Sequence, residues 1–321
     1  MRRLALLLVA FGLSGCAGSV VLSPPGPHSD GWRAVEAHTR TLGLGLPGGA
    51  YLAPGVRFAG GVQVLTPSHD RLHSLSDLKV VGGDFVSVSD WGDLFRFTPR
   101  LDRRGRLTGL GDIRMRPLTG LDGEPFPTKS DGDAEGLAVT ADGELLVSFE
   151  GDHRIWSYGP LAALADRPVR ISTPAITASS DVGLEGLAAA PGGWRAAGEG
   201  GGVWDCTPAA CTAVSPPPAT EIPVTEWRNT GLDRDPSGAG WFVVRRIYRA
   251  PIDMRGQVRR MAPDGALGPV LVELRLPSTV DNFEGIAAVA RPDGGVRLYI
   301  LSDDNGNPVQ KTLMLAFDVA N

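Results

Sequence analysis

Residues 133–151 decide the fold, and they read DAEGLAVTADGELLVSFEG. A short apolar run follows Glu135, and it leads into Asp142-Gly143, a strong signal for a tight hairpin turn. A second apolar run then ends at Glu150. The stretch therefore predicts a β-hairpin that carries one carboxylate near its start and another at its end.

The same block recurs along the chain. Two further copies are clear: residues 182–200 read VGLEGLAAAPGGWRAAGEG, and residues 282–304 read NFEGIAAVARPDGGVRLYILSDD. Two degenerate copies fit the same frame, LSDLKVVGGDFVSVSD at residues 75–90 and TGLDRDPSGAGWFVVRR at residues 230–246. A period of roughly 50 residues, with about four strands per unit, is typical of propeller blades. We predict an all-β fold, a β-propeller of about six blades in which the first or last blade is completed by the opposite terminus.

Composition agrees with this fold and limits the partners. The 321 residues include 43 Gly and 26 Pro, which favours short strands joined by tight turns. The long amphipathic helices of a doubly wound α/β fold are missing from the pattern, and a sandwich would not need a repeated Glu-Gly start. The net charge is −5 and no basic stripe is present, which argues against nucleic acid as a partner. We expect a monomer that binds a small-molecule ligand or substrate.

The first residues resemble a bacterial lipoprotein signal peptide. Residues 2–3 are both Arg, and the apolar run at residues 4–13 is too short to span a membrane. Leu-Ser-Gly-Cys at residues 13–16 resembles a lipobox, in which the Cys becomes the lipidated first residue of the mature protein. The alternative is an ordinary signal peptide with an incidental Cys.

These features predict the domain plan and the location. Residues 1–16 are the predicted signal, ending at lipidated Cys16; residues 17–30 are a flexible tether; and residues 31–321 are one propeller domain. We expect an exported protein, lipid-anchored in the bacterial envelope at the outer membrane and facing the periplasm. Its only contact with a membrane would be the lipid anchor.

Cys206 and Cys211 are the remaining cysteines. A zinc site would need two more soft ligands, and neither His nor Cys lies within local reach. In an oxidising compartment we therefore predict a disulfide that closes the tip of a hairpin.

Acidic residues recur where a propeller would bring them together. The innermost strand of each blade runs along the central channel, and Gly after Glu lets neighbouring backbones approach there. The candidate metal ligands on these strands are Glu135, Glu185 and Glu284, and Asp77 and Asp233 stand at the corresponding places in the degenerate copies. One hairpin later, the predicted residues of the channel mouth are Asp90, Glu150, Glu199, Arg245 and Asp303.

Carboxylates this close need a cation, an Arg or a proton to neutralise them. Oxygen ligands suit Ca²⁺ or Mg²⁺, so Ca²⁺ is the candidate cofactor. The alternative is that the carboxylates accept hydrogen bonds from backbone N–H groups of the adjacent blade and hold the ring together without a ligand. Arg245 or Arg246 is a candidate to neutralise the ring or to bind an anion, with a plain surface position as the alternative.

Other catalytic patterns are missing. The histidines show no HExxH spacing, no Gly-x-Ser-x-Gly elbow occurs, and no Gly-rich phosphate loop precedes a helix pattern. Serine-hydrolase and zincin chemistry of those types is therefore not indicated.

The repeated motifs resemble the phytase-like family, also described as having esterase-like activity of phytase. The resemblance rests on the Glu-Gly-Leu-Ala copies at residues 135–138 and 185–188 and on the C-terminal stretch at residues 281–317, with its Ser-Asp-x-Asn and Asn-Pro-x-Gln motifs. It extends from about Arg57 to Val319 and implies an exported propeller related to calcium-dependent β-propeller phytases. The chain departs from the family at residues 74–78, where Ser-Leu-Ser-Asp-Leu replaces the usual Gly-Leu-Ser-Gly-Leu.

The resemblance and the residues lead to one working hypothesis, a metal-assisted hydrolase of an ester or phosphoester. Its Ca²⁺ would be held by Glu135, Glu185 and Glu284, with a bound water as the nucleophile. The basic cluster that a phytase needs for its substrate phosphates is not evident beyond Arg245, Arg246 and Arg249. The rival hypotheses are a non-catalytic envelope propeller that binds a ligand or partner, and a sugar- or lactone-active propeller enzyme.

Overall fold

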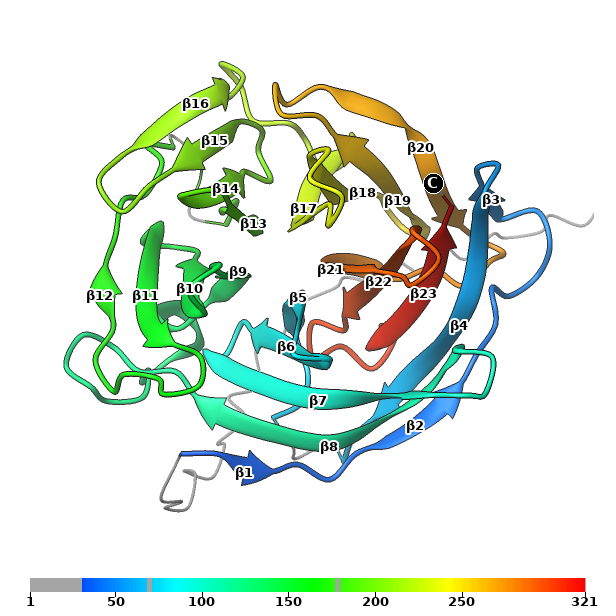
Figure 1. Cartoon of the computed structure of the whole chain (residues 1–321), viewed down its shortest axis with the longest axis horizontal. Coiled ribbons are helices and arrows are strands. Elements are labelled where there is room, and N and C mark those ends of the chain that lie inside the picture. The colour runs from blue at the N-terminus through cyan, green and yellow to red at the C-terminus, as the bar shows by residue number, and fades with distance from the viewer. Residues whose placement is uncertain (1–30, 68–70, 177–178, 180, 321) are drawn as a thin grey trace, which may run out of the picture.

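The computed structural model describes residues 31–67, 71–176, 179 and 181–320, and their regular secondary structure is almost entirely β-strand (Figure 1). The sheets stand radially around a central axis, so the predicted all-β propeller is confirmed. The predicted signal peptide, its lipidation site Cys16 and the tether lie outside the described residues. Within those residues, no helix has the length and apolar character that crossing a membrane requires.

Five blades surround the axis, each with four strands that run in order from the inside outwards. Blade 1 contains β5 (Leu75–Val81), β6 (Asp84–Ser89), β7 (Asp93–Leu101) and β8 (Leu107–Pro117). Blade 2 contains β9 (Ala134–Val139), β10 (Glu144–Phe149), β11 (Arg154–Pro160) and β12 (Val169–Arg170). Blade 3 contains β13 (Gly186–Ala190), β14 (Gly193–Ala197), β15 (Val203–Cys206) and β16 (Cys211–Ser215). Blade 4 contains β17 (Arg228–Arg234), β18 (Trp241–Arg249), β19 (Asp253–Met261) and β20 (Leu267–Arg275). Blade 5 contains β21 (Asn282–Ala290), β22 (Val296–Asp303), β23 (Leu313–Val319) and β4 (Val56–Leu65).

The N-terminal strands explain why the described chain has five blades, so that the expected count of about six is wrong. They build no blade of their own and add to the outside of others: β4 pairs antiparallel with β23 and completes blade 5. This closure by the opposite terminus was predicted. The shorter strands β1 (Arg33–Ala34), β2 (His38–Thr41) and β3 (Ala50–Leu52) pair with β8, β4 and β20 respectively.

The five inner strands form a closed ring. Each of β5, β9, β13, β17 and β21 contacts the next, and β21 contacts β5 again. Glycine permits this approach. A Cβ added to Gly231 would lie only 2.0 Å from the carbonyl oxygen of Glu284, and one added to Gly136 would lie 2.7 Å from that of Glu185.

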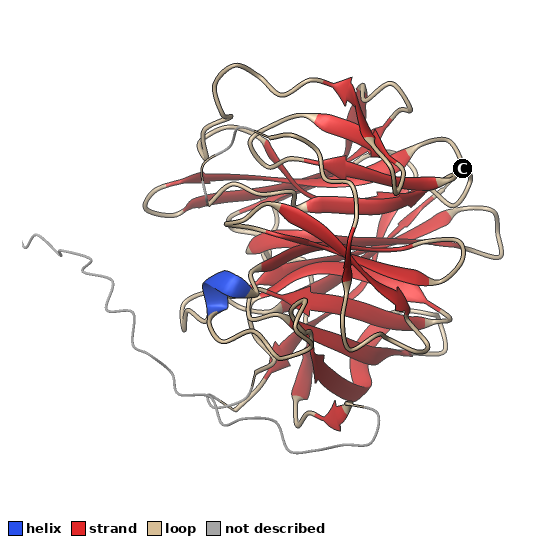
Figure 2. Ribbon diagram, turned by 90° about the vertical axis from the view of Figure 1, so that its left-hand side faces the viewer, coloured by secondary structure: helices blue, strands red, loops and turns tan. Residues whose placement is uncertain are grey.

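Apolar side chains fill the spaces between neighbouring blades. Val86 and Val88 of blade 1, for example, share one cluster with Leu137 and Val147 of blade 2, and all four are buried. Figure 2 shows the ring from its side, with the one short helix of the described residues, η1 (Lys129–Asp131), at one of its faces. The core thus fixes the blades, while the loops at this face remain free to form a site.

A disulfide joins Cys206 and Cys211, as the sequence predicts. It links the adjacent strands β15 and β16 in the outer part of blade 3. It lies in a hairpin and not on the inner strands that form the ring.

Candidate metal centre on the propeller axis

A β-bulge at the same place in four inner strands positions the axial side chains. The bulge leaves one residue unpaired with the neighbouring strand: Ser76 in β5, Glu135 in β9, Thr230 in β17 and Glu284 in β21. In blade 3 the corresponding residue is Glu185, immediately before β13. The three predicted glutamates therefore occupy equivalent positions in three blades.

Asp77 and Asp233 do not join this ring, and their predicted place at the channel mouth is wrong. A side-chain oxygen of Asp77 accepts a hydrogen bond from the backbone N–H of Leu137 in the next blade, at 2.9 Å. Asp233 likewise accepts from Ala288 of the next blade, at 2.7 Å. Both carboxyls are buried, and burial raises the pKa of Asp77 to about 7 and that of Asp233 to about 6. These two residues thus hold neighbouring blades together. This is the structural role that the alternative hypothesis, a ring without a ligand, gave to all the carboxylates.

A second tier of charged residues lies one hairpin later. Asp90 and Glu150 directly follow β6 and β10, and their backbone N–H groups bond back to the residues just before the inner strands. Glu199 lies two residues after the end of β14, and its backbone N–H bonds to the carbonyl of Gly183, ahead of β13; Asp303 ends β22 opposite Asn282. These four predicted mouth residues therefore lie at equivalent places.

In blade 4 the corresponding residue is Arg246, not the predicted Arg245. Side chains alternate along a strand, so neighbouring residues face opposite sides. Arg245 donates to the Asn229 side chain and to the carbonyl of Trp227, and burial lowers its pKa to about 10. Arg246 instead reaches the acidic residues at the axis.

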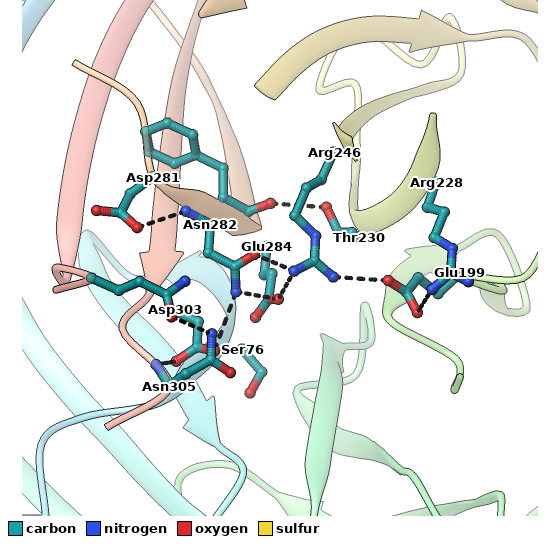
Figure 3. Close-up of polar contacts among 12 residues, drawn as sticks. Ser76, Glu199, Arg228, Thr230, Arg246, Asp281, Asn282, Glu284, Asp303 and Asn305 are labelled. Carbon is teal, nitrogen blue, oxygen red and sulfur yellow. Dashed lines mark hydrogen bonds and ion pairs between the residues drawn. The ribbon is translucent and has the colours of Figure 1, made fainter. Parts of the chain in front are cut away.

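One half of the ring is neutralised by arginine. Arg246 lies between Glu199 and Glu284, with N–O distances of 2.8 and 3.3 Å (Figure 3). Arg228 adds a second contact to Glu199, at 2.9 Å. Burial still raises the pKa of Glu284 to about 8, against the opposing effect of Arg246. Asn282 donates to Glu284 at 2.8 Å and to Asp303 at 3.3 Å, and so links the two tiers.

The other half of the ring carries carboxylates without arginine partners. Glu135, Glu150 and Glu185 place one oxygen each within 4.8 Å of one another. Among the described residues, none of the three forms an ion pair with a basic side chain closer than 4 Å. Glu185 is only 5 % exposed, and its Oε2 is buried without a hydrogen-bond partner. An unpartnered buried carboxylate oxygen is costly, so this half of the ring is incomplete as a purely structural network.

The electrostatics agree with this conclusion. Burial, followed by the neighbouring carboxylates, raises the pKa of Glu135 and of Glu185 well above the usual value. The same causes raise the pKa of Glu150 to about 8. The cluster therefore holds either protons or a cation at neutral pH, and three carboxylate oxygens are a suitable ligand set for a hard divalent ion.

Asp133 and Lys129 extend this half of the ring, and the sequence analysis did not select them. Asp133 lies just before β9, and one of its oxygens is within 4.8 Å of oxygens of Asp90 and Glu135. Lys129 of η1 contacts Asp133 at 2.7 Å and Asp90 at 3.2 Å. Asp133 is the first residue of the motif at residues 133–151, so its position in that motif could have identified it as a candidate site residue. Nothing in the sequence pattern around Lys129 pointed to the axis.

Comparison with known proteins gives a family and distant structural likenesses. No curated protein matches the sequence. The aldose sugar dehydrogenase of Streptomyces coelicolor in its PQQ-bound form is 12 % identical, with a TM-score of 0.43, covering 85 % of this chain and 99 % of its own. A protein described as a gluconolactonase is 14 % identical, with a TM-score of 0.44 and coverage of 92 % and 96 %. The β-propeller domain of Cps50 (Swd1) from Myceliophteria thermophila is 12 % identical, with a TM-score of 0.39 and coverage of 88 % and 99 %. At these scores the likenesses carry no argument about ligands or activity.

The sequence match to a family is more specific. The profile of the family described as phytase-like, with esterase-like activity of phytase, matches residues 70–228. That segment contains blades 1 to 3, and with them Glu135, Glu150 and Glu185. The chain is therefore a β-propeller whose residues 70–228 match the model of the phytase-like family.

Proposed function

We propose that this protein is a divalent-cation-dependent hydrolase of an ester or a phosphoester, with its site at the axial end that Glu135, Glu150 and Glu185 line. The main observation behind this proposal is the buried Oε2 of Glu185, which has no hydrogen-bond partner among the described residues. Glu185 belongs to a cluster of three carboxylates. The family match, whose description names an esterase-like activity, supports a hydrolytic role.

The proposed cation is Ca²⁺, because the donors are carboxylate oxygens with no His or Cys among them. The proposed ligands differ in one residue from those that the sequence suggested. Glu284 already has Arg246 and Asn282 as partners, so Glu150 takes its place beside Glu135 and Glu185. A divalent cation held there supplies a bound water of lowered pKa and a Lewis-acid contact for a carbonyl or phosphoryl oxygen.

The remaining residues would handle the proton and the position of the substrate. Asp133 adjoins Glu135, and burial raises its pKa although Lys129 opposes this, so it is placed to accept a proton from an attacking water. Arg246 and Asn282 border the site on its neutralised side. They would orient a substrate that enters from that side.

Calorimetric titration and thermal melting with Ca²⁺, Mg²⁺, Mn²⁺ and Zn²⁺ test the cation. Ca²⁺ at 100 times its dissociation constant would stabilise the fold by about 2.7 kcal/mol. Glu185→Gln should abolish this gain, whereas Glu36→Gln, at an exposed position in the N-terminal segment, should keep it. If no ion binds at millimolar concentration, the proposed centre is wrong.

Turnover of carboxyl esters, phosphomonoesters and lactones separates the enzyme from its rivals. Cation-dependent hydrolysis of an ester or phosphoester that Glu185→Gln abolishes supports the proposal. Cation binding without turnover of any of these substrates would instead identify a ligand-binding propeller, and turnover of lactones alone would favour the sugar- and lactone-active alternative.

We also propose that the protein is exported and lipid-anchored through Cys16, on the basis of the lipobox-like sequence at residues 13–16. Metabolic labelling with radioactive palmitate should label the wild-type protein and leave Cys16→Ser unlabelled. Equal labelling of the two would show that the anchor is elsewhere.

A further inference from the structure

Exposed apolar side chains gather at one place on the described surface. Of its ten exposed large hydrophobic residues, four line a single pocket of about 470 Å³: Val224, Ile252, Leu276 and Val309. Val309 is 80 % exposed and Ile252 is 70 % exposed. A concentration of this kind marks a binding surface, whereas single exposed apolar residues need no explanation.

The four residues come from four different loops. Val224 precedes β17, Ile252 lies between β18 and β19, Leu276 lies between β20 and β21, and Val309 lies between β22 and β23. All four loops belong to blades 4 and 5 or lead into them. Loops from several strand connections that converge on one hollow, on a rigid scaffold, are the usual way in which a propeller or barrel builds a ligand site.

This pocket shares two lining residues with the neutralised half of the axial ring. Arg246 and Asn282 line the pocket, and the same two side chains contact Glu284 of the ring. Figure 3 shows both residues beside Glu284, with Asp281 of the pocket next to Asn282 and Asn305 next to Asp303. A ligand that fills the pocket therefore reaches the neutralised edge of the ring.

The polar part of the pocket is unsuited to phosphate groups. Among the described residues, the charged side chains that line it are Arg246 and Asp281, one of each sign, and Arg246 is already paired with Glu199 and Glu284. The other polar lining side chains are neutral: the hydroxyl of Tyr248, which donates to the carbonyl of Pro251, and amides that include Asn305 and Gln310, which bond to each other. Recognition of several phosphates requires a cluster of unpaired Arg or Lys, and the described residues that line the pocket do not provide one.

We propose that this pocket binds the apolar acyl or aryl group of the substrate, and that the substrate class of the axial site is a neutral carboxylic ester and not a polyphosphate. This inference rests on the proposed hydrolase function and narrows it. In the reaction the oxygen of water bonds to the acyl carbon, the bond between that carbon and the ester oxygen breaks, and the leaving alkoxide takes up a proton. The products are a carboxylic acid and an alcohol, so the atoms balance without an oxidant or any other co-reactant.

A series of p-nitrophenyl esters from acetate to octanoate, assayed with Ca²⁺ present, tests the inference. Burial of each added methylene in an apolar pocket should raise kcat/KM by about fourfold until the pocket is full. Phytate and p-nitrophenyl phosphate should be poorer substrates than the hexanoate ester. A flat chain-length profile, or a preference for phytate, would overturn the inference.

Charged substitutions in the pocket supply the variant test. Leu276→Asp and Val309→Asp alter side chains that are 55 % and 80 % exposed, so they leave the core untouched. Each should flatten the chain-length dependence. The matched control is Val169→Asp, at a position 62 % exposed in β12 of blade 2 and outside the pocket, which should retain the full dependence. An unchanged profile in both pocket variants would refute the assignment.

Binding of hexanamide, a neutral amide that lacks the ester bond, separates this inference from the proposed function. Suppose that no ester is hydrolysed, but calorimetry shows that hexanamide binds the wild type and the Val169→Asp control and does not bind Val309→Asp. This result would support the pocket as a ligand site and would refute the hydrolase function. If esters are hydrolysed without chain-length dependence and hexanamide does not bind, the result would support the hydrolase function and would refute the assignment of the pocket.

Discussion

Replacing Gly231 by Ala should destabilise the propeller at the contact between blades 4 and 5. The added Cβ would lie 2.0 Å from the carbonyl oxygen of Glu284 and 2.9 Å from a methyl carbon of Val244. The first distance is far below van der Waals contact, and the clashing atom is backbone, so the inner strands β17 and β21 must separate. Overpacking of this kind costs about 1–3 kcal/mol, and a backbone clash places this variant at about 3 kcal/mol.

Thermal melting of the purified protein measures this effect, with Gly43→Ala as the matched control. A Cβ on Gly43 meets no atom within 4 Å, so that variant should be neutral or more stable by about 0.4–1 kcal/mol. At about 2–4 °C per kcal/mol, Gly231→Ala should lower the Tm by roughly 6–12 °C. If its Tm lies within about 1 °C of the wild-type Tm, the close approach of the inner strands is not what requires glycine.

Three further predictions concern the ring and the disulfide. In the presence of a metal chelator, the Tm should fall as the pH rises from about 5 to above 8. The folded state raises the pKa values of Glu150 and Glu284 to about 8, so protonation of these groups favours the folded state and the stabilisation is lost as the pH rises through about 8. A Tm that is constant over this range contradicts the electrostatics described. Arg246→Met should cost about 3–5 kcal/mol in urea unfolding, because it leaves the buried Glu284 without its cation and leaves Glu199 paired with Arg228 alone. A cost below about 1 kcal/mol would show that the pairing is not structural. Replacing both Cys206 and Cys211 by Ser should cost only about 2 kcal/mol, because the bridged residues are 5 apart in sequence, and ion binding at the axis should be unchanged.

The fold could be predicted because the inner hairpins carry their own sequence signature. A Glu-Gly pair, an Asp-Gly turn and two apolar runs specify one blade edge locally, and repetition at a fixed period then specifies a propeller. The number of blades could not be deduced in the same way. Outer strands such as β4 have no repeated motif, and pairing between β4 and β23 depends on contacts between distant parts of the chain.

The site was predicted only in part, because a β-bulge changes which residue faces the axis. In the degenerate copies the frame pointed to Asp77 and Asp233, but the bulges place Ser76 and Thr230 beside the glutamates. A shift of one residue moves a side chain to the opposite face of a strand, which is also why Arg246 and not Arg245 enters the ring. Sequence periodicity specifies strands well, whereas local irregularities of one residue become visible only in coordinates.

The pairing of β4 with β23 has a consequence for synthesis of the chain. Val62 and Met314 are register partners, although about 250 residues separate them in the sequence, so the last blade can form only after nearly the whole chain has been made. Until then β4 presents an unpaired edge to other chains, which is a hazard for aggregation. A product that ends before β23 would lack the strand that joins β22 to β4, and premature termination would therefore leave blade 5 incomplete.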